Sequence, residues 1–80
     1  MNESIPAGAS IFAVRTGSSS SPALNGDILM DHHQETWRFI RVVESARVSD
    51  CRVTARHAVS GKVVTVAPQV FNLRIVWEQP

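Results

Sequence analysis

The side chains with the most potential for chemistry lie in one polar segment, residues 31–36, where Asp31 is followed directly by His32 and His33. Imidazole and carboxylate groups both ligate zinc, so these three residues together with His57 are a candidate metal set. Adjacent residues on an extended chain point to opposite faces, however, so the two neighbouring histidines would not easily share one ion. We therefore predict no metal site here and interpret the segment as a polar hairpin connection between two strands.

A nucleophile and a base are also present, in the form of Cys51 and His57. A catalytic pair must lie within hydrogen-bond reach. If both residues belong to one strand, however, six residues at about 3.3 Å each separate them by roughly 20 Å. The serines at 18–21 have no histidine at a spacing that supports their activation. We therefore predict that the protein is not an enzyme and that it carries no cofactor.

Basic residues are concentrated in one half of the chain, although the net charge is only +1. Residues 1–36 hold one arginine against four acidic side chains, whereas residues 37–76 hold seven basic side chains against two acidic ones. Guanidinium groups bind phosphate through a bidentate fork, and a basic stripe on a small β domain is typical of phosphate binding. The candidate nucleic-acid contacts are Arg38, Arg41, Arg52, Arg56 and Arg74.

A second candidate surface is apolar. Segment 37–43 is hydrophobic on both faces, whereas a strand with one solvated face should alternate cleanly. Its alternation places the two aromatic residues and Val43 on one face, and Ile40 and Val42 on the other. Apolar surface of this kind, left outside the core, would suit a protein partner. The candidate protein-interface residues are Ile40, Val42, Val70 and Val76.

These side chains would be positioned by strands. Segment 37–43 favours strand over helix, because its β-branched residues lose rotamer freedom in helices. In segment 51–57 the alternation turns the apolar residues inward and turns Arg52, Thr54 and Arg56 outward. The predicted strands cover residues 9–15, 26–30, 37–44, 51–57, 62–66 and 70–77.

Short strands without a convincing amphipathic helix predict an all-β fold. We expect one domain over residues 1–80, with residues 1–8 as a loose N-terminal arm and residues 16–25 as a flexible serine-rich loop. So short a chain has little material to cover a flat sheet, and closing the sheet removes its exposed edges. The expected architecture is a small five- to six-stranded antiparallel barrel or half-barrel, SH3-like or OB-like. No motif is specific enough to identify a family.

Location and function follow from the same features. Cys51 is the single cysteine and cannot form an intramolecular disulfide, and the first residues lack the pattern of an export signal, so we expect a cytoplasmic protein. No membrane contact or small-molecule substrate is indicated. We favour a non-enzymatic binding module that binds itself or another protein, such as an adaptor in a phage or plasmid assembly. The alternative is a small barrel that binds nucleic acid through an arginine-rich strand face.

Overall fold

The computed structural model describes residues 3–17 and 21–79. Within these ranges the chain forms six strands and two short 3-10 helices, and it contains no α-helix. The predicted all-β class is therefore confirmed. The elements are β1 (Ser10–Arg15), β2 (Ile28–Met30), β3 (Thr36–Val43), η1 (Val48–Asp50), β4 (Arg52–His57), β5 (Val63–Val66), η2 (Pro68–Phe71) and β6 (Leu73–Glu78).

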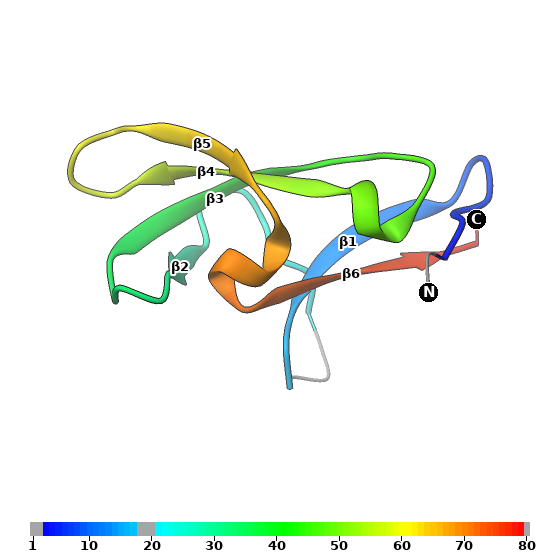
Figure 1. Cartoon of the computed structure of the whole chain (residues 1–80), viewed down its shortest axis with the longest axis horizontal. Coiled ribbons are helices and arrows are strands. Elements are labelled where there is room, and N and C mark those ends of the chain that lie inside the picture. The colour runs from blue at the N-terminus through cyan, green and yellow to red at the C-terminus, as the bar shows by residue number, and fades with distance from the viewer. Residues whose placement is uncertain (1–2, 18–20, 80) are drawn as a thin grey trace.

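The strands are arranged in two antiparallel sheets. One sheet has four strands in the order β2-β3-β4-β5, and the other is a ribbon of β1 and β6. Figure 1 shows this ribbon running beneath the four-stranded sheet. No closed barrel is found among the described residues, so the four-stranded sheet keeps two edges, one at β2 and one at β5.

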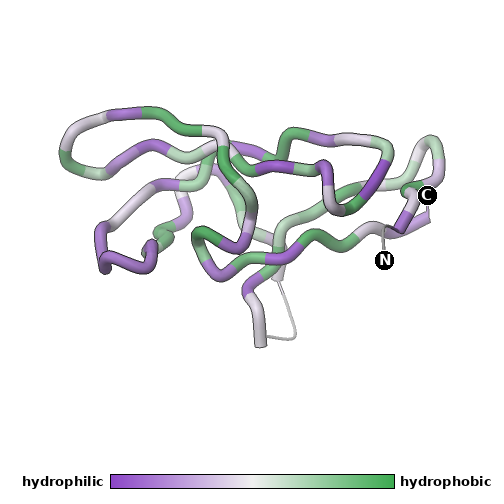
Figure 2. Tube along the Cα trace, viewed as in Figure 1, coloured by the Kyte–Doolittle hydropathy of each residue, from purple (hydrophilic) through white to green (hydrophobic). Residues whose placement is uncertain are grey.

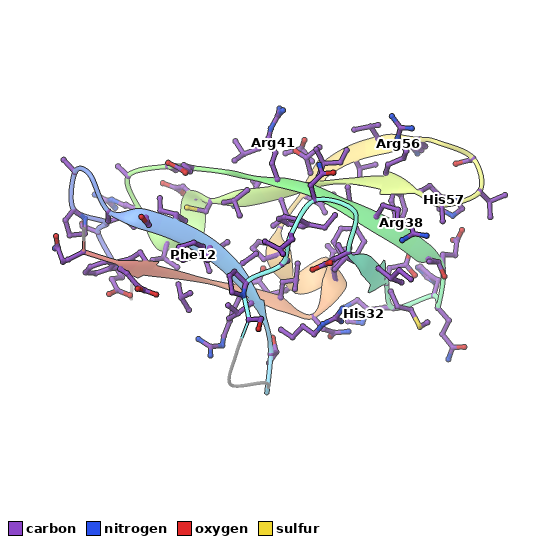
Figure 3. All side chains as sticks on the ribbon, turned by 180° about the vertical axis from the view of Figure 1, so that it is seen from behind. Phe12, His32, Arg38, Arg41, Arg56 and His57 are labelled. Carbon is purple, nitrogen blue, oxygen red and sulfur yellow. The ribbon has the colours of Figure 1, made fainter. Side chains whose placement is uncertain are left out.

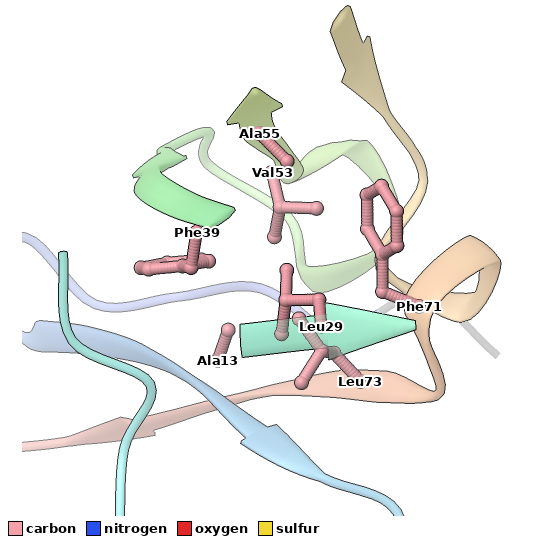
Figure 4. Packing of buried hydrophobic residues seen from close by; sticks show 7 residues of the cluster. All are labelled: Ala13, Leu29, Phe39, Val53, Ala55, Phe71 and Leu73. Atoms are coloured by element: carbon pink, nitrogen blue, oxygen red, sulfur yellow. The ribbon is translucent and has the colours of Figure 1, made fainter. Parts of the chain in front are cut away.

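One hydrophobic core lies between the two sheets (Figure 4). Every strand except β5 contributes a buried residue to it, and η2 adds Phe71. Even the three-residue strand β2 is anchored in this way, because Leu29 is only 1% exposed. The core residues are Ala13, Leu29, Phe39, Val53, Ala55, Phe71 and Leu73.

A β-bulge in β3 changes which residues face the core. The register between β3 and β4 shifts between Phe39 and Arg41, so Ile40 is an extra residue. Beyond this point Val42 pairs with the core residue Val53 and packs against the core. Val43 is on the outer face and 36% exposed. The expected alternation, with Val43 facing inward and Val42 outward, was therefore wrong after the bulge.

The last strand begins later than predicted. Residues 70–72 belong to η2 and its end, and β6 starts at Leu73. Pro68 suits the first turn of a helix because it has no N–H to donate there. Asn72 ends the turn in the left-handed region, with φ 58°. This turn directs Phe71 into the core, where it is 2% exposed.

Parts of the expected arm and loop are hydrogen-bonded to the rest of the domain. In the arm, Ile5 N–H donates to the carbonyl of Ala46 at 2.8 Å, and Val48 N–H donates to the carbonyl of Glu3 at 2.8 Å. In the loop, Ala23 N–H donates to the carbonyl of Ala13 at 2.8 Å. Residues 18–20, at the centre of the predicted serine-rich loop, lie outside the described residues.

Candidate functional site

The connection between β2 and β3 is organised by Asp31. Its Oδ1 accepts hydrogen bonds from the backbone N–H groups of His33 at 2.8 Å and Glu35 at 3.0 Å. Its Oδ2 accepts one from the indole Nε1 of Trp37 at 2.9 Å. Figure 2 shows this connection as a hydrophilic stretch at one end of the molecule. The carboxylate is therefore occupied in shaping the turn.

These contacts also affect the pKa of Asp31. Partial desolvation raises its pKa, but the hydrogen bonds from Trp37, Glu35 and His33 and the nearby charge of His33 outweigh it. The net result is that the pKa of Asp31 lies below its ordinary value. The residue is therefore ionised when it accepts these bonds.

The imidazole of His57 has both nitrogens occupied. Nδ1 accepts hydrogen bonds from the backbone N–H groups of Val59 at 3.3 Å and Ser60 at 3.1 Å. The proton of the neutral ring must then be on Nε2, which donates to Oε1 of Glu35 at 2.7 Å. The ring also packs edge-on against Trp37, with centroids 4.8 Å apart. In this arrangement neither nitrogen is free to ligate a metal or to accept a substrate proton.

The other candidate reactive groups are separated from one another. Cys51 is fully buried at the opposite end of β4 from His57, with its Sγ 3.5 Å from the carbonyl of Arg47. His32 Nε2 lies 3.2 Å from the carbonyl of Gln69. Within residues 3–17 and 21–79 no three His, Cys, Asp or Glu side chains are grouped as a metal site would need. The described side chains therefore offer no assembled catalytic or metal centre.

Three of the five predicted arginines share the outer face of the four-stranded sheet. Arg38 on β3 is the direct cross-strand partner of Arg56 on β4. Arg41 is the partner of Thr54, which lies two residues before Arg56 and so on the same face. All three are exposed, and Figure 3 shows Arg41 and Arg56 projecting from the sheet. We call Arg38, Arg41 and Arg56 the arginine face.

No carboxylate lies within ion-pair distance of the arginine face in the described part of the chain, where the one contact between a basic and an acidic side chain is the hydrogen bond from His57 to Glu35. Like charges directly opposite each other destabilise a sheet. Arg38 relieves part of this repulsion by donating from Nη1 to the carbonyl of Gly26 at 3.0 Å. The arginine face is nevertheless a cluster of positive charge that the described residues leave uncompensated.

Arg38 and Arg56 belong to a row of four cross-strand neighbours, one from each strand of the sheet, and all four side chains are exposed. Ile28 on β2 pairs with Arg38, and Val63 on β5 pairs with Arg56. The two apolar side chains are 53% and 52% exposed. Sequence reasoning missed both residues, because only the cross-strand register shows that they flank the arginines.

The other two predicted arginines lie elsewhere. Arg52 turns toward η1, where its Nη1 donates to the carbonyls of Ser49 at 2.8 Å and Cys51 at 2.9 Å. Together with Arg74 of β6 it lines a separate hollow. Thr54, predicted to face outward between Arg52 and Arg56, is only 5% exposed, and its Oγ1 lies 3.0 Å from that of Thr65. The predicted stripe is therefore divided.

The four predicted interface residues do not gather on one surface. Ile40 is in the bulge and lines a hollow together with Arg38 and Arg56 of the arginine face. Val42 and Val70 pack against the core. Val76 belongs to the other sheet, where it pairs with Phe12.

Three comparisons with known proteins found no similar protein. No family model matches the chain, and neither the curated proteins nor the solved structures contain a significant match. Within the described residues no helix is long and apolar enough to cross a membrane. The class that the coordinates define is thus a small all-β domain with a basic sheet face.

Proposed function

We propose that this protein is a non-enzymatic binding module and that the arginine face holds the phosphate backbone of double-stranded nucleic acid. The observation that carries the proposal is the direct opposition of Arg38 and Arg56, with Arg41 beside them and no carboxylate partner in the described residues. A free sheet gains nothing from this arrangement, because opposed like charges are unfavourable. A chain of phosphates would neutralise it through charge-assisted, bidentate hydrogen bonds.

The aromatic residues support a duplex over a single strand. Proteins that bind single strands stack bases on exposed aromatic side chains. Here Phe39 is buried in the core, and Trp37 packs between His57 and Phe71. The arginine face therefore offers guanidinium groups for the backbone and no aromatic platform for unstacked bases.

Two expectations from the sequence accompany this proposal. We regard the two sheets around one core as an open relative of an SH3-like or OB-like half-barrel. We also place the protein in the cytoplasm, where the unpaired thiol of Cys51 would stay reduced. Neither expectation carries the binding argument. Self-association is the second candidate function, and it is supported by the free edge of β5.

The salt dependence of duplex binding tests the proposal. Three phosphate contacts predict a slope of about −2.7 for log K against log salt concentration, which means a roughly 40-fold weaker affinity at 200 mM than at 50 mM salt. Arg56→Gln should reduce the magnitude of this slope by about 0.9. Arg74→Gln is the matched control, because it removes the same charge from the other sheet.

The measurement is fluorescence anisotropy of a labelled random duplex at several salt concentrations. A slope that changes with Arg56→Gln and not with Arg74→Gln supports the arginine face. Equal slopes for the two variants, or no binding at low salt, would overturn the assignment.

A further inference from the structure

Strand β5 has a free edge. It is the last strand of the four-stranded sheet and, among the residues that the structure describes, it pairs only with β4 (Figure 1). No backbone hydrogen bond of another described segment reaches Val63–Val66 from the other side. The strand is therefore available to a further strand along its whole length.

The register identifies the backbone groups at this edge. In an antiparallel pair, hydrogen-bonded and non-hydrogen-bonded residue pairs alternate. His57 N–H donates to the carbonyl of Lys62 at 2.7 Å, so Val63 and Thr65 are in non-hydrogen-bonded pairs with β4. The close approach of the Thr54 and Thr65 hydroxyls, at 3.0 Å, agrees with this assignment. The N–H and C=O groups of Val63 and Thr65 therefore point away from the sheet.

The opposite edge of the sheet, at β2, is protected. This strand has only three residues, and Arg15 Nη2 donates to the carbonyl of Ile28 at 2.8 Å. Short strands and covering cations are known ways to prevent edge pairing. In contrast, Val63–Val66 contains no charged residue and no proline, and no described side chain is bonded to its outward groups. The edge at β5, unlike the edge at β2, is therefore open to pairing with a further strand.

We propose that β5 pairs antiparallel with β5 of a second copy of this chain. With Val64 opposite Val64 on a two-fold axis, the outward groups of Val63 meet those of Thr65 of the second copy, and the reverse pair is identical. Each of the two pairs exchanges two hydrogen bonds, which uses all the outward groups of both strands. Val63 and Thr65 lie symmetrically about Val64, so two copies of the strand leave none of their outward backbone groups unpaired. For this reason we favour a second copy of the chain over a foreign strand.

The pairing is compatible with the charges. The two-fold axis is perpendicular to the sheet, so both arginine faces lie on the same side of one eight-stranded sheet. The two copies of Arg56 are then three strand spacings apart and offset by two residues, which is roughly 16 Å. This exceeds the Debye length of about 8 Å at physiological ionic strength, so their repulsion is screened. If the proposed function holds, one duplex would meet six arginines in place of three.

Sedimentation equilibrium without nucleic acid tests this pairing independently of the proposed function. A short edge interface predicts weak dimers, with Kd on the order of 10 µM to 1 mM. Val63→Pro removes an outward N–H that β4 does not use, and proline is tolerated at the start of an edge strand. It should raise Kd more than tenfold. Val63→Thr keeps the N–H and the branched shape, so it should leave Kd within about twofold.

Amide exchange measured by NMR on the unmodified chain tests the same pairing without a substitution. Its result therefore does not depend on whether a variant folds. The N–H groups of Val63 and Thr65 should exchange more slowly as the protein concentration rises, in proportion to the fraction of chains that remain monomeric. Those of Val64 and Val66 should be protected at both concentrations, because they bond to β4. A monomer at every concentration up to about 1 mM, or a dimer whose formation leaves the exchange rates of the Val63 and Thr65 amides unchanged, would overturn the proposal.

Discussion

Replacing Arg56 with glutamate should stabilise the fold while it removes binding. In the present sheet Arg56 faces Arg38 directly across the β3–β4 ladder, with both side chains exposed. Arg56→Gln would end the repulsion, and Arg56→Glu would replace it with an attractive pair. A protein that keeps an unfavourable pair on an open sheet face gives up stability for a function, so the two properties should change in opposite directions.

The size of the effect can be worked from the geometry. Cross-strand charge pairs contribute roughly 0.2–1 kcal/mol. The hydrogen bond from Arg38 to the carbonyl of Gly26 holds that guanidinium toward β2 and weakens the repulsion. We therefore expect Arg56→Gln to raise the free energy of unfolding by an amount at the lower end of this range, about 0.3 kcal/mol. Arg56→Glu adds an attraction between the new carboxylate and Arg38, which brings the expected increase in the free energy of unfolding to about 0.8 kcal/mol. For a domain of this size that gain corresponds to a Tm increase of roughly 3–6 °C.

Thermal denaturation followed by circular dichroism in low-salt buffer measures this difference. Arg47→Glu is the matched control, because it makes the same change of charge at an exposed arginine whose bridge partner is the neutral Ser4. The gain should largely vanish in 1 M NaCl, where the Debye length is about 3 Å. A Tm for Arg56→Glu no higher than that of the control would refute the idea that the opposed arginines cost stability.

Two further predictions concern the framework around the site. Leu29→Ala should cost roughly 2–5 kcal/mol in urea unfolding, because Leu29 is 1% exposed and is the one core residue from β2; a cost below about 1 kcal/mol would mean that β2 is not packed as described. Asp31 contributes stability above its unfolded pKa, and this contribution is lost as the pH falls through its lowered folded pKa, below about pH 4. Asp31→Asn should therefore be less stable than the parent at neutral pH, with the difference shrinking in acid. A difference independent of pH would contradict the proposed role of the carboxylate.

The strands were predictable from the sequence, but their register was not. In β4 the alternation correctly turned Val53 and Ala55 inward, where both are fully buried. In β3 the same reasoning failed after Ile40, because the bulge shifts the alternation by one residue and the sequence hides this shift, since Val42 and Val43 are both apolar. The short helix at Pro68–Phe71 was missed because an apolar run ending in a strand resembles a longer strand.

The candidate site was predictable only in part for a related reason. Alternation within each strand placed Arg38 and Arg56 on outward faces, and this is the arrangement found. Periodicity carries no information on strand order, so it could not show that β6 pairs with β1 and takes Arg74 to another sheet. The free edge of β5 and the protection of β2 by Arg15 likewise depend on which strands are neighbours.

The pairing of β1 with β6 has a consequence for how the protein folds during its synthesis. β1 leaves the ribosome well before β6, the strand with which it pairs and which carries the core residue Leu73. Contacts this distant in sequence form slowly. Until they form, the apolar segment Ser10–Arg15 is an unpaired strand that neighbouring nascent chains could capture. The core of this protein is thus completed only after nearly all of the described chain has been made, and its yield in a cell should depend on how well β1 is kept apart from its copies until that moment.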